Sequence, residues 1–140
     1  MRTRGGRRVS SGRTASCSCG RLTVTVVGDP VRVSVCHCLA CQRRTGSVFG
    51  TQARFPRTDA TIEGPSSVWV RVADSGHRIA FHFCPNCGAT VYYLPEAESD
   101  LIAIPLGAFG DPGFPQPRVS VYEVSRHPWV ELPDSIERYD

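Results

Sequence analysis

Apolar and polar residues alternate in several short stretches of the chain. In residues 22–26 and again in residues 31–35, valine or leucine occupies every second position, with threonine, serine or arginine between. A period of two residues is typical of a β-strand with one buried face. The turn sequence Gly28-Asp29-Pro30 separates the two stretches. The pattern therefore predicts a β-hairpin whose second strand runs directly into Cys36.

The same pattern predicts further strands later in the chain, at residues 48–55, 68–72, 78–83, 90–94, 101–106 and 119–124. Residues 41–46 are expected to form a turn or short helix, and residues 56–64 a loop. No window shows a sustained helical period. Short strands separated by turns every ~8 to 12 residues predict an all-β domain, as a sandwich or a barrel-like body. Its core is expected to contain Phe55, Trp69, Phe83 and Trp129.

The composition bounds the class of protein. The chain has 140 residues, of which 41% are hydrophobic and 21% charged, as in a soluble domain of ordinary size. No apolar run approaches the ~20 residues of a membrane-spanning helix, and the first residues do not resemble a signal peptide. We therefore expect a cytoplasmic protein without a membrane partner, in a compartment where thiols stay reduced.

The net charge of +3 is unevenly distributed. Residues 1–13 carry five of the 16 basic residues, all of them arginine, and no acid. Residues 14–140 then hold 11 arginines against 13 carboxylates, a charge of −2. This distribution predicts a disordered arginine-rich tail over residues 1–13 and a single domain over residues 14–140. A mildly acidic domain does not favour a nucleic-acid partner.

Seven cysteines fall into three groups: Cys17 and Cys19, then Cys36, Cys38 and Cys41, then Cys84 and Cys87. In a reducing compartment such spacing indicates metal binding rather than disulfides. Four thiolates complete a tetrahedral structural zinc site, whereas three leave one position open for chemistry. A division into four and three therefore predicts two zinc ions per chain, one structural and one catalytic.

The outer two pairs are expected to form the four-cysteine site. In an extended strand Cys17 and Cys19 would point to the same side, and the Cys-x-x-Cys of Cys84 and Cys87 is a tight turn in which two thiolates converge. Joining the pairs closes a long loop at roughly a few kcal/mol. Structural zinc can contribute on the order of 10 kcal/mol. We expect this zinc to fasten the first strand to the later sheet.

The central trio, Cys36, Cys38 and Cys41, is expected to form the catalytic site. Three thiolates around Zn²⁺ give a net charge of −1, and soft ligands suit sulfur chemistry. The open position therefore predicts a thiol substrate held as its thiolate. In an extended chain His37 points away from its neighbours, which predicts a place on the surface or behind the ligands.

The residues after the trio are candidates for substrate binding. Arg43 and Arg44 could bind a substrate carboxylate, and the backbone at Ser47 could bind an anion. Phe49 could contact a substrate or belong to the core. A solvated turn is the alternative interpretation of the segment.

Four segments together resemble the glutathione-dependent formaldehyde-activating enzyme family, also called the centromere protein V/Gfa domain. They are CSCG at Cys17–Gly20, CHCLACQRRTGS at Cys36–Ser47, FCPNCG at Phe83–Gly88 and SRHPWVELPD at Ser125–Asp134. The resemblance extends over residues 14–140 and implies a β-tent of antiparallel sheets. It also implies that the four outer cysteines bind the structural zinc and the central trio binds the catalytic zinc.

The activity that the resemblance implies is a carbon–sulfur lyase of the S-(hydroxymethyl)glutathione synthase type. Such an enzyme condenses formaldehyde, or a related aldehyde, with glutathione or another thiol. The alternative is a non-catalytic zinc-binding module for a protein or nucleic-acid partner.

Overall fold

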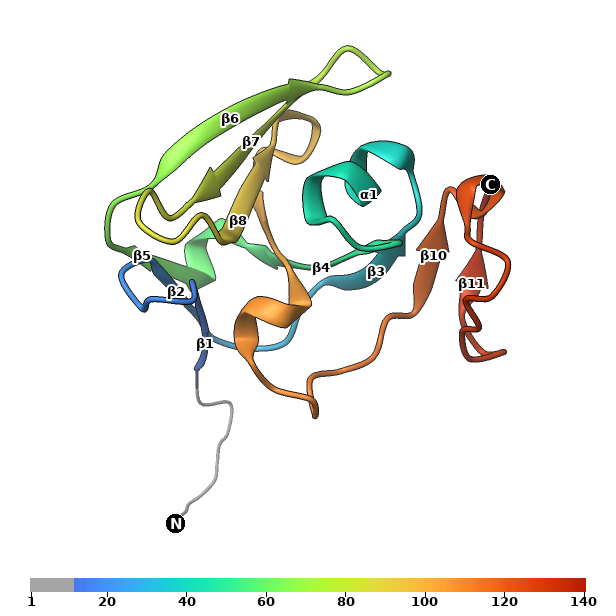
Figure 1. Cartoon of the computed structure of the whole chain (residues 1–140). Coiled ribbons are helices and arrows are strands. Elements are labelled where there is room, and N and C mark those ends of the chain that lie inside the picture. Colours follow the sequence, from blue (N-terminus) through green and yellow to red (C-terminus); the bar gives the residue numbers. More distant parts are fainter. Residues whose placement is uncertain (1–11) are drawn as a thin grey trace.

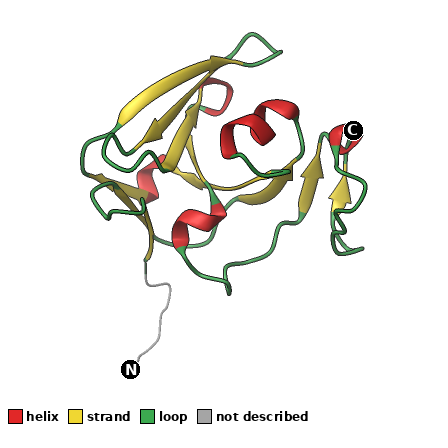
Figure 2. Cartoon of the chain, viewed as in Figure 1, coloured by secondary structure: helices red, strands yellow, loops and turns green. Residues whose placement is uncertain are grey.

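A computed structural model describes residues 12–140 and arranges them in two β-sheets (Figure 1 and Figure 2). The smaller sheet has the order β1-β2-β5 and contains Arg13–Ser16, Thr23–Val26 and Ala60–Glu63. The larger sheet has the order β11-β10-β3-β4-β9-β8-β7-β6. Its strands, in chain order from β3, are Arg32–Cys36, Gly50–Pro56, Ser67–Val72, Arg78–Phe83, Thr90–Pro95, Leu101–Ile104, Val119–Val121 and Glu137–Arg138. The prediction of an all-β domain is confirmed.

Helical structure is sparse among the described residues. The helix α1 covers Leu39–Thr45, and the 3₁₀ turns η1 to η4 cover Arg57–Asp59, Glu96–Glu98, Leu106–Phe109 and Glu123–Ser125. None of the helices within residues 12–140 is long and apolar enough to span a membrane. The helix α1 corresponds to the turn or short helix expected over residues 41–46, and it begins two residues earlier, at Leu39.

The main core lies between the two sheets. Val24 and Val26 of β2, together with Leu22 directly before it, are fully buried against residues of the larger sheet that include Phe55 and Ile102. In β2 the buried valines alternate with half-buried threonines, as the period of two requires. The sequence pattern therefore identifies correctly which face of this strand is buried.

The predicted hairpin of residues 22–26 and 31–35 is wrong. β2 pairs with β1 and β5, whereas β3 pairs with β4 and β10 in the other sheet. The link through Gly28, whose φ is 76°, carries the chain from one sheet to the other. Alternation specifies a buried face but not a partner strand, and two facing sheets bury both strands equally well.

The sequence pattern does not predict β1 and β5, the two outer strands of the smaller sheet. β5 lies within residues 56–64, which were expected to be loop, and all but one of its residues are exposed. β1 begins at Arg13, one residue before the predicted start of the domain. Because β5 buries almost nothing, it has no alternation to detect. The rest of the predicted tail, residues 1–11, lies outside the described residues.

The expected aromatic core is only partly correct. Phe55 is fully buried, but Trp69 is 53% exposed and Trp129 is 70% exposed. Trp69 belongs to β6, which forms the edge of the larger sheet and exposes most of its apolar side chains. An apolar run at a sheet edge resembles a core strand in sequence, so the pattern alone misplaces it.

The larger sheet carries a pronounced bend that encloses α1. Figure 1 shows α1 beside the β6–β7 hairpin on one side and β10 on the other. Within the sheet β10 lies parallel to both β3 and β11, while the other pairs are antiparallel. The end of β3, the start of α1 and the end of β10 therefore meet at one place, which is where the central cysteines lie.

Candidate metal centres

The four outer cysteines converge between the two sheets. The Sγ atoms of Cys17, Cys19, Cys84 and Cys87 all lie within 4.8 Å of one another. Sγ of Cys19 is 3.7 Å from that of Cys17 and 3.6 Å from that of Cys84. One pair follows β1 and the other follows β7, so the cluster connects the smaller sheet to the larger one. The prediction that these cysteines come together is confirmed.

Two similar turns present these thiols. The backbone N–H of Leu22 donates to Sγ of Cys17, and that of Asn86 donates to Sγ of Cys84, each at 3.3 Å. Each turn also contains a glycine with positive φ, Gly20 at 85° and Gly88 at 81°. Cys17 and Cys19 therefore converge through a tight turn rather than through the extended strand that we expected.

The central trio forms a second cluster. Sγ atoms of Cys36, Cys38 and Cys41 lie within 4.8 Å of one another. Cys36 ends β3, Cys38 caps the N-terminus of α1 and Cys41 lies in its first turn. The Cys38 sulfur accepts a hydrogen bond from the backbone N–H of Cys41 at 3.3 Å. The end of β3 and the start of α1 therefore bring three sulfur atoms together.

A fourth protein ligand is absent from the central cluster as far as residues 12–140 are concerned. In this part of the chain, no histidine nitrogen, carboxylate oxygen or other cysteine sulfur lies within 4.8 Å of all three sulfurs. His37 lies between two of the cysteines in sequence, but its Nε2 is 2.9 Å from Oγ of Ser120. His37 is thus buried behind the cluster, one of the two places expected for it.

The electrostatics of the trio suit a divalent cation. Hydrogen bonds from Cys36 and Cys41 lower the pKa of Cys38, and the pKa of Cys36 is raised because its thiol donates to Cys38 and is buried. Three thiols at this separation can share one negative charge but cannot all ionise without a cation. Both clusters could hold metal ions, and an all-sulfur donor set fits zinc.

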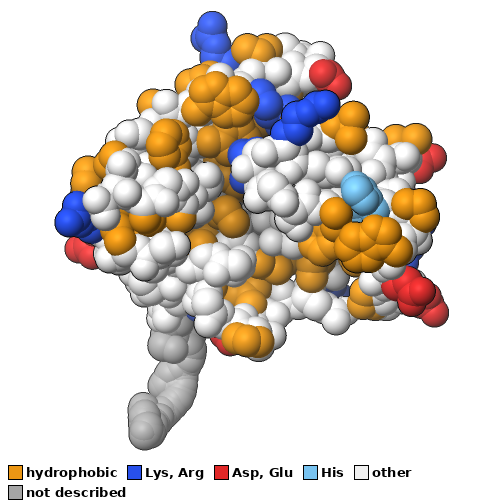
Figure 3. Space-filling view, in the orientation of Figure 1, with side chains coloured by type: hydrophobic (Ala, Val, Ile, Leu, Met, Phe, Trp, Pro, Cys, Tyr) orange, Lys and Arg blue, Asp and Glu red, His pale blue; other side chains and the backbone are white. Residues whose placement is uncertain are grey.

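The central cluster opens into a cavity of about 500 Å³. Its walls come from α1, β4, β8, the β6–β7 hairpin and the segment after β10. Figure 3 shows a hollow on this face, with basic side chains gathered over β7 and α1. The volume is in the range of pockets that hold small organic ligands. A substrate in this cavity can therefore reach the three sulfurs.

Charged groups without ion-pair partners line this cavity. Arg44, Arg71 and Asp74 all contribute to its walls, and within residues 12–140 none of the three forms a salt bridge. The guanidinium of Arg44 lies 4.7 Å from the ring centroid of Phe81, and its Nη2 is 4.0 Å from Sγ of Cys41. These side chains are therefore free to pair with a charged ligand.

A buried tyrosine also belongs to the cavity wall. Tyr93 lines it and donates a hydrogen bond of 2.9 Å to Oε1 of Gln52, whose Nε2 donates to Oγ of Ser34 at 2.7 Å. Burial raises the pKa of Tyr93, although the charge of Arg44 opposes this. The phenol therefore stays protonated at neutral pH and can donate a hydrogen bond.

Of the four predicted substrate residues, the structure places Arg44 alone in the cavity wall. Arg43 and Ser47 are exposed outside it, and Phe49 packs on His37 with ring centroids 5.8 Å apart. Consecutive residues of a helix point in different directions, so only one of the two arginines can face the cavity. We therefore leave Arg43, Ser47 and Phe49 out of the proposed site.

The sequence does not identify several of the residues that line the cavity. Arg71, Asp74, Tyr93 and Tyr122 come from three separate elements and share no motif with the cysteines. Only the pairing of β6, β7 and β8 brings the first three of them near the trio. No signal within their own segments distinguishes them from ordinary strand and turn residues.

Comparison with known proteins gives two findings. Residues 12–125 match the sequence profile of the family described as glutathione-dependent formaldehyde-activating enzyme. A crystal structure of a Rhodobacter sphaeroides protein is similar, with a TM-score of 0.55 and 14% sequence identity. That match covers 91% of this chain and 99% of the other, and at this identity it supports the fold alone. No curated protein matches the chain.

Proposed function

The chain belongs to the glutathione-dependent formaldehyde-activating enzyme family, and from this premise we propose that it is a zinc-dependent carbon–sulfur lyase. In this proposal it condenses formaldehyde, or a related aldehyde, with glutathione or another thiol. Cys17, Cys19, Cys84 and Cys87 hold a structural zinc, and Cys36, Cys38 and Cys41 hold the catalytic one. The observation that carries the proposal is the cavity, because its wall contains the central trio.

Zinc held by Cys36, Cys38 and Cys41 would act as a Lewis acid that lowers the pKa of a substrate thiol, so that the thiol would react as its thiolate. Side chains of the protein would bind and orient the substrates and supply the proton. The trio shares the cavity wall with Arg44, Arg71 and Asp74, so a thiol that reaches the trio has the rest of its molecule within reach of these three side chains. Glutathione carries two carboxylates and one ammonium group, which matches two unpaired guanidiniums and one unpaired carboxylate. Such pairing orients the sulfur toward the aldehyde.

Tyr93 is the proposed proton donor. When the sulfur attacks the aldehyde carbon, a carbon–sulfur bond forms and an electron pair of the C=O bond moves to oxygen. The hydroxyl of Tyr93 can turn from Gln52 toward that oxygen and deliver its proton, giving the hydroxymethyl thioether. Solvent then returns a proton to the phenolate. The proton lost by the thiol on binding balances this one.

The direct test is turnover by the zinc-loaded protein. We expect formaldehyde and glutathione to combine faster than their spontaneous reaction, as measured by loss of free thiol and by NMR of the product. If no rate above the spontaneous one is found with glutathione or with other thiols, the lyase assignment is wrong. A non-catalytic zinc module would then be the better interpretation of the two clusters.

Replacing Arg44 with alanine is expected to weaken thiol binding. The change removes a charge-assisted contact of about 1.5–3 kcal/mol, so KM for glutathione should rise about 10- to 100-fold while kcat changes less. The matched control is R43A, because Arg43 is the neighbouring arginine and lies outside the cavity. Equal effects of the two substitutions would contradict the assigned role. Steady-state kinetics with glutathione as the varied substrate gives both numbers.

Replacing Tyr93 with phenylalanine is expected to lower kcat about 100- to 1,000-fold at unchanged zinc content, because it removes the proposed proton donor. The matched control is Y92F. Tyr92 is also buried and also hydrogen-bonded, in its case to Nδ1 of His82 at 3.1 Å, but it does not line the cavity. Comparable losses in both variants would mean that the Tyr93 hydroxyl acts on stability and not on catalysis.

A further inference from the structure

His37 is fully enclosed although it lies between two cysteines of the central cluster. Its exposed fraction is 0%, and its Nε2 is 2.9 Å from Oγ of Ser120 and 3.4 Å from Oε2 of Glu123. Serine, histidine and glutamate in contact can suggest a nucleophilic triad. Ser120 is also 0% exposed, so no substrate reaches its hydroxyl. The contact must therefore act on something other than a bound substrate.

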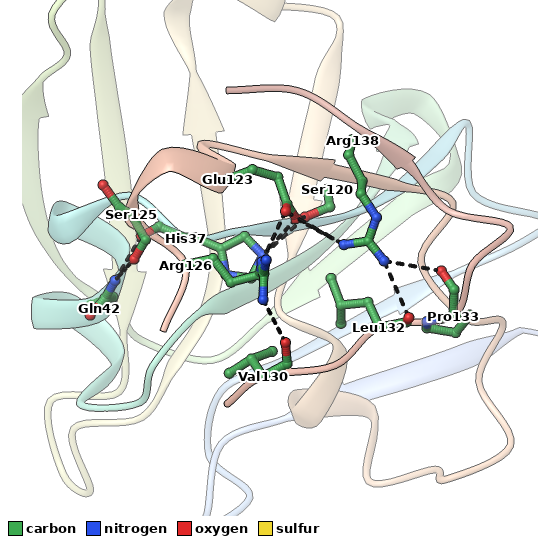
Figure 4. Close-up of polar contacts among 10 residues, drawn as sticks. All are labelled: His37, Gln42, Ser120, Glu123, Ser125, Arg126, Val130, Leu132, Pro133 and Arg138. Atoms are coloured by element: carbon green, nitrogen blue, oxygen red, sulfur yellow. Dashed lines mark hydrogen bonds and ion pairs between the residues drawn. The ribbon is translucent and has the colours of Figure 1, made fainter. Parts of the chain in front are cut away.

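Glu123 is the centre of this group (Figure 4). It accepts hydrogen bonds from Oγ of Ser120 and from Nε of Arg126, the latter at 2.9 Å, and forms an ion pair of 3.4 Å with Arg138. Burial acts to raise the pKa of Glu123, but the bond from Ser120 and the charge of Arg126 lower it below its usual range. A charged carboxylate therefore stands directly behind His37.

The backbone N–H and C=O of His37 are both hydrogen-bonded, the first to the C-terminal segment and the second to α1. The N–H of His37 donates to the carbonyl of Val121 at 3.1 Å, and the carbonyl of His37 accepts from Nε2 of Gln42 at 2.8 Å. The same Gln42 nitrogen donates to the carbonyl of Ser125 at 3.1 Å. Both the main chain and the ring of this residue are consequently fixed by residues 120–125 and by α1.

Packing alone does not require this arrangement. Apolar side chains could fill the same space, often with equal or better stability, because a buried charge costs solvation. The hydrogen bonds instead fix the orientation of His37, the residue that joins Cys36 to Cys38 in the chain. Partners behind the ligands commonly determine how well a metal site is arranged.

We propose that Glu123 is a positioning residue that, through His37 and Ser120, fixes the relative placement of Cys36 and Cys38 and so sets the metal affinity of the central cluster. The four-cysteine cluster, which these residues do not contact, is unaffected. The inference rests on the proposed metal at the central trio and not on the proposed reaction.

The test is chelator competition with the zinc-loaded full chain. We expect two phases of zinc release, one from each cluster. The variant C41S should lack one of them, and the missing phase is thereby assigned to the central cluster. In E123Q that phase should shift to an affinity about 10- to 100-fold weaker, while the phase of the four-cysteine cluster stays in place. Cobalt exchanged into the central site should show an altered ligand-field spectrum in the same variant.

The matched control is E98Q. Glu98 is a partly buried carboxylate that also accepts from two arginines, Arg32 and Arg54, but it has no contact with His37. A loss of thermal stability in E123Q and E98Q, with wild-type zinc affinity in both, would overturn the inference. If E123Q does not fold, S120A makes the smaller change and is expected to weaken the central site about 10-fold. A weakened central site in a protein without turnover would leave the inference standing and reject the reaction.

Discussion

Replacing Cys84 with serine is expected to unfold the domain. Cys84 is 0% exposed within the main core, and its cluster joins the turn after β1 to the turn after β7. Serine has nearly the same shape but does not supply a thiolate. Structural zinc contributes on the order of 10 kcal/mol in small metal-folded peptides, against a total stability of about 5–15 kcal/mol for a domain. With the proposed structural zinc bound there, losing this sulfur removes a large part of the free energy that holds the two sheets together.

Circular dichroism during heating and zinc analysis measure this effect. C84S should show no cooperative transition, or one lowered by more than about 15 °C, and should retain at most one zinc per chain. The wild-type chain treated with a strong chelator is the control, and it should approach the same unfolded state. A variant that melts within about 2 °C of the wild type and keeps its full zinc content would show that the cluster is not structural.

The two cysteine clusters are the part of this protein that the sequence predicts best. Cys-x-Cys, Cys-x-x-Cys and the central trio carry their geometry locally, because a turn of three or four residues is enough to make two sulfurs converge. The local conformation was nonetheless mistaken at Cys17, where a turn closed by Leu22 replaces the expected extended strand. The spacing of the cysteines therefore predicts which of them cluster, but it does not predict the backbone conformation that brings them together.

The cavity could not be predicted in the same way. Arg71 and Tyr93 reach it only because β6, β7 and β8 pair in sequence order and the sheet bends round α1 (Figure 1). Strand pairing and sheet curvature are long-range properties, and alternation in one strand carries no information on either. The same limit produced the false hairpin between β2 and β3, which lie in different sheets.

The C-terminal segment is a further example. Residues 119–124 were predicted to be a strand, and β10 does form over Val119–Val121. The chain then turns at Tyr122, the one non-glycine residue with positive φ among those described, and Glu123 faces inward toward His37. Nothing in the alternation marks a residue after a strand as the partner of a loop more than 80 positions earlier. That relation exists only in three dimensions.

Replacing Cys38 with serine is expected to abolish turnover and to leave the domain folded. The sulfur of Cys38 caps α1 by accepting from the N–H of Cys41, and serine is among the best residues at this position. The helix therefore begins as before, and we expect the melting temperature to change by less than about 5 °C. Loss of one of three thiolates should lower kcat/KM at least about 100-fold, because even changes behind a metal ligand cost 10- to 100-fold.

The contrast between C38S and C84S separates an open site from a closed one. If the central trio served only structure, with its fourth position taken by a fixed ligand, C38S would lower stability about as much as C84S does. An open site predicts a folded protein that has lost its reaction and the zinc of the central cluster, while the zinc of the four-cysteine cluster stays bound. Circular dichroism, zinc content and the rate of thiol consumption, measured on the same three preparations of wild type and both variants, give these outcomes directly. A C38S variant with wild-type turnover would place the reaction elsewhere in the molecule.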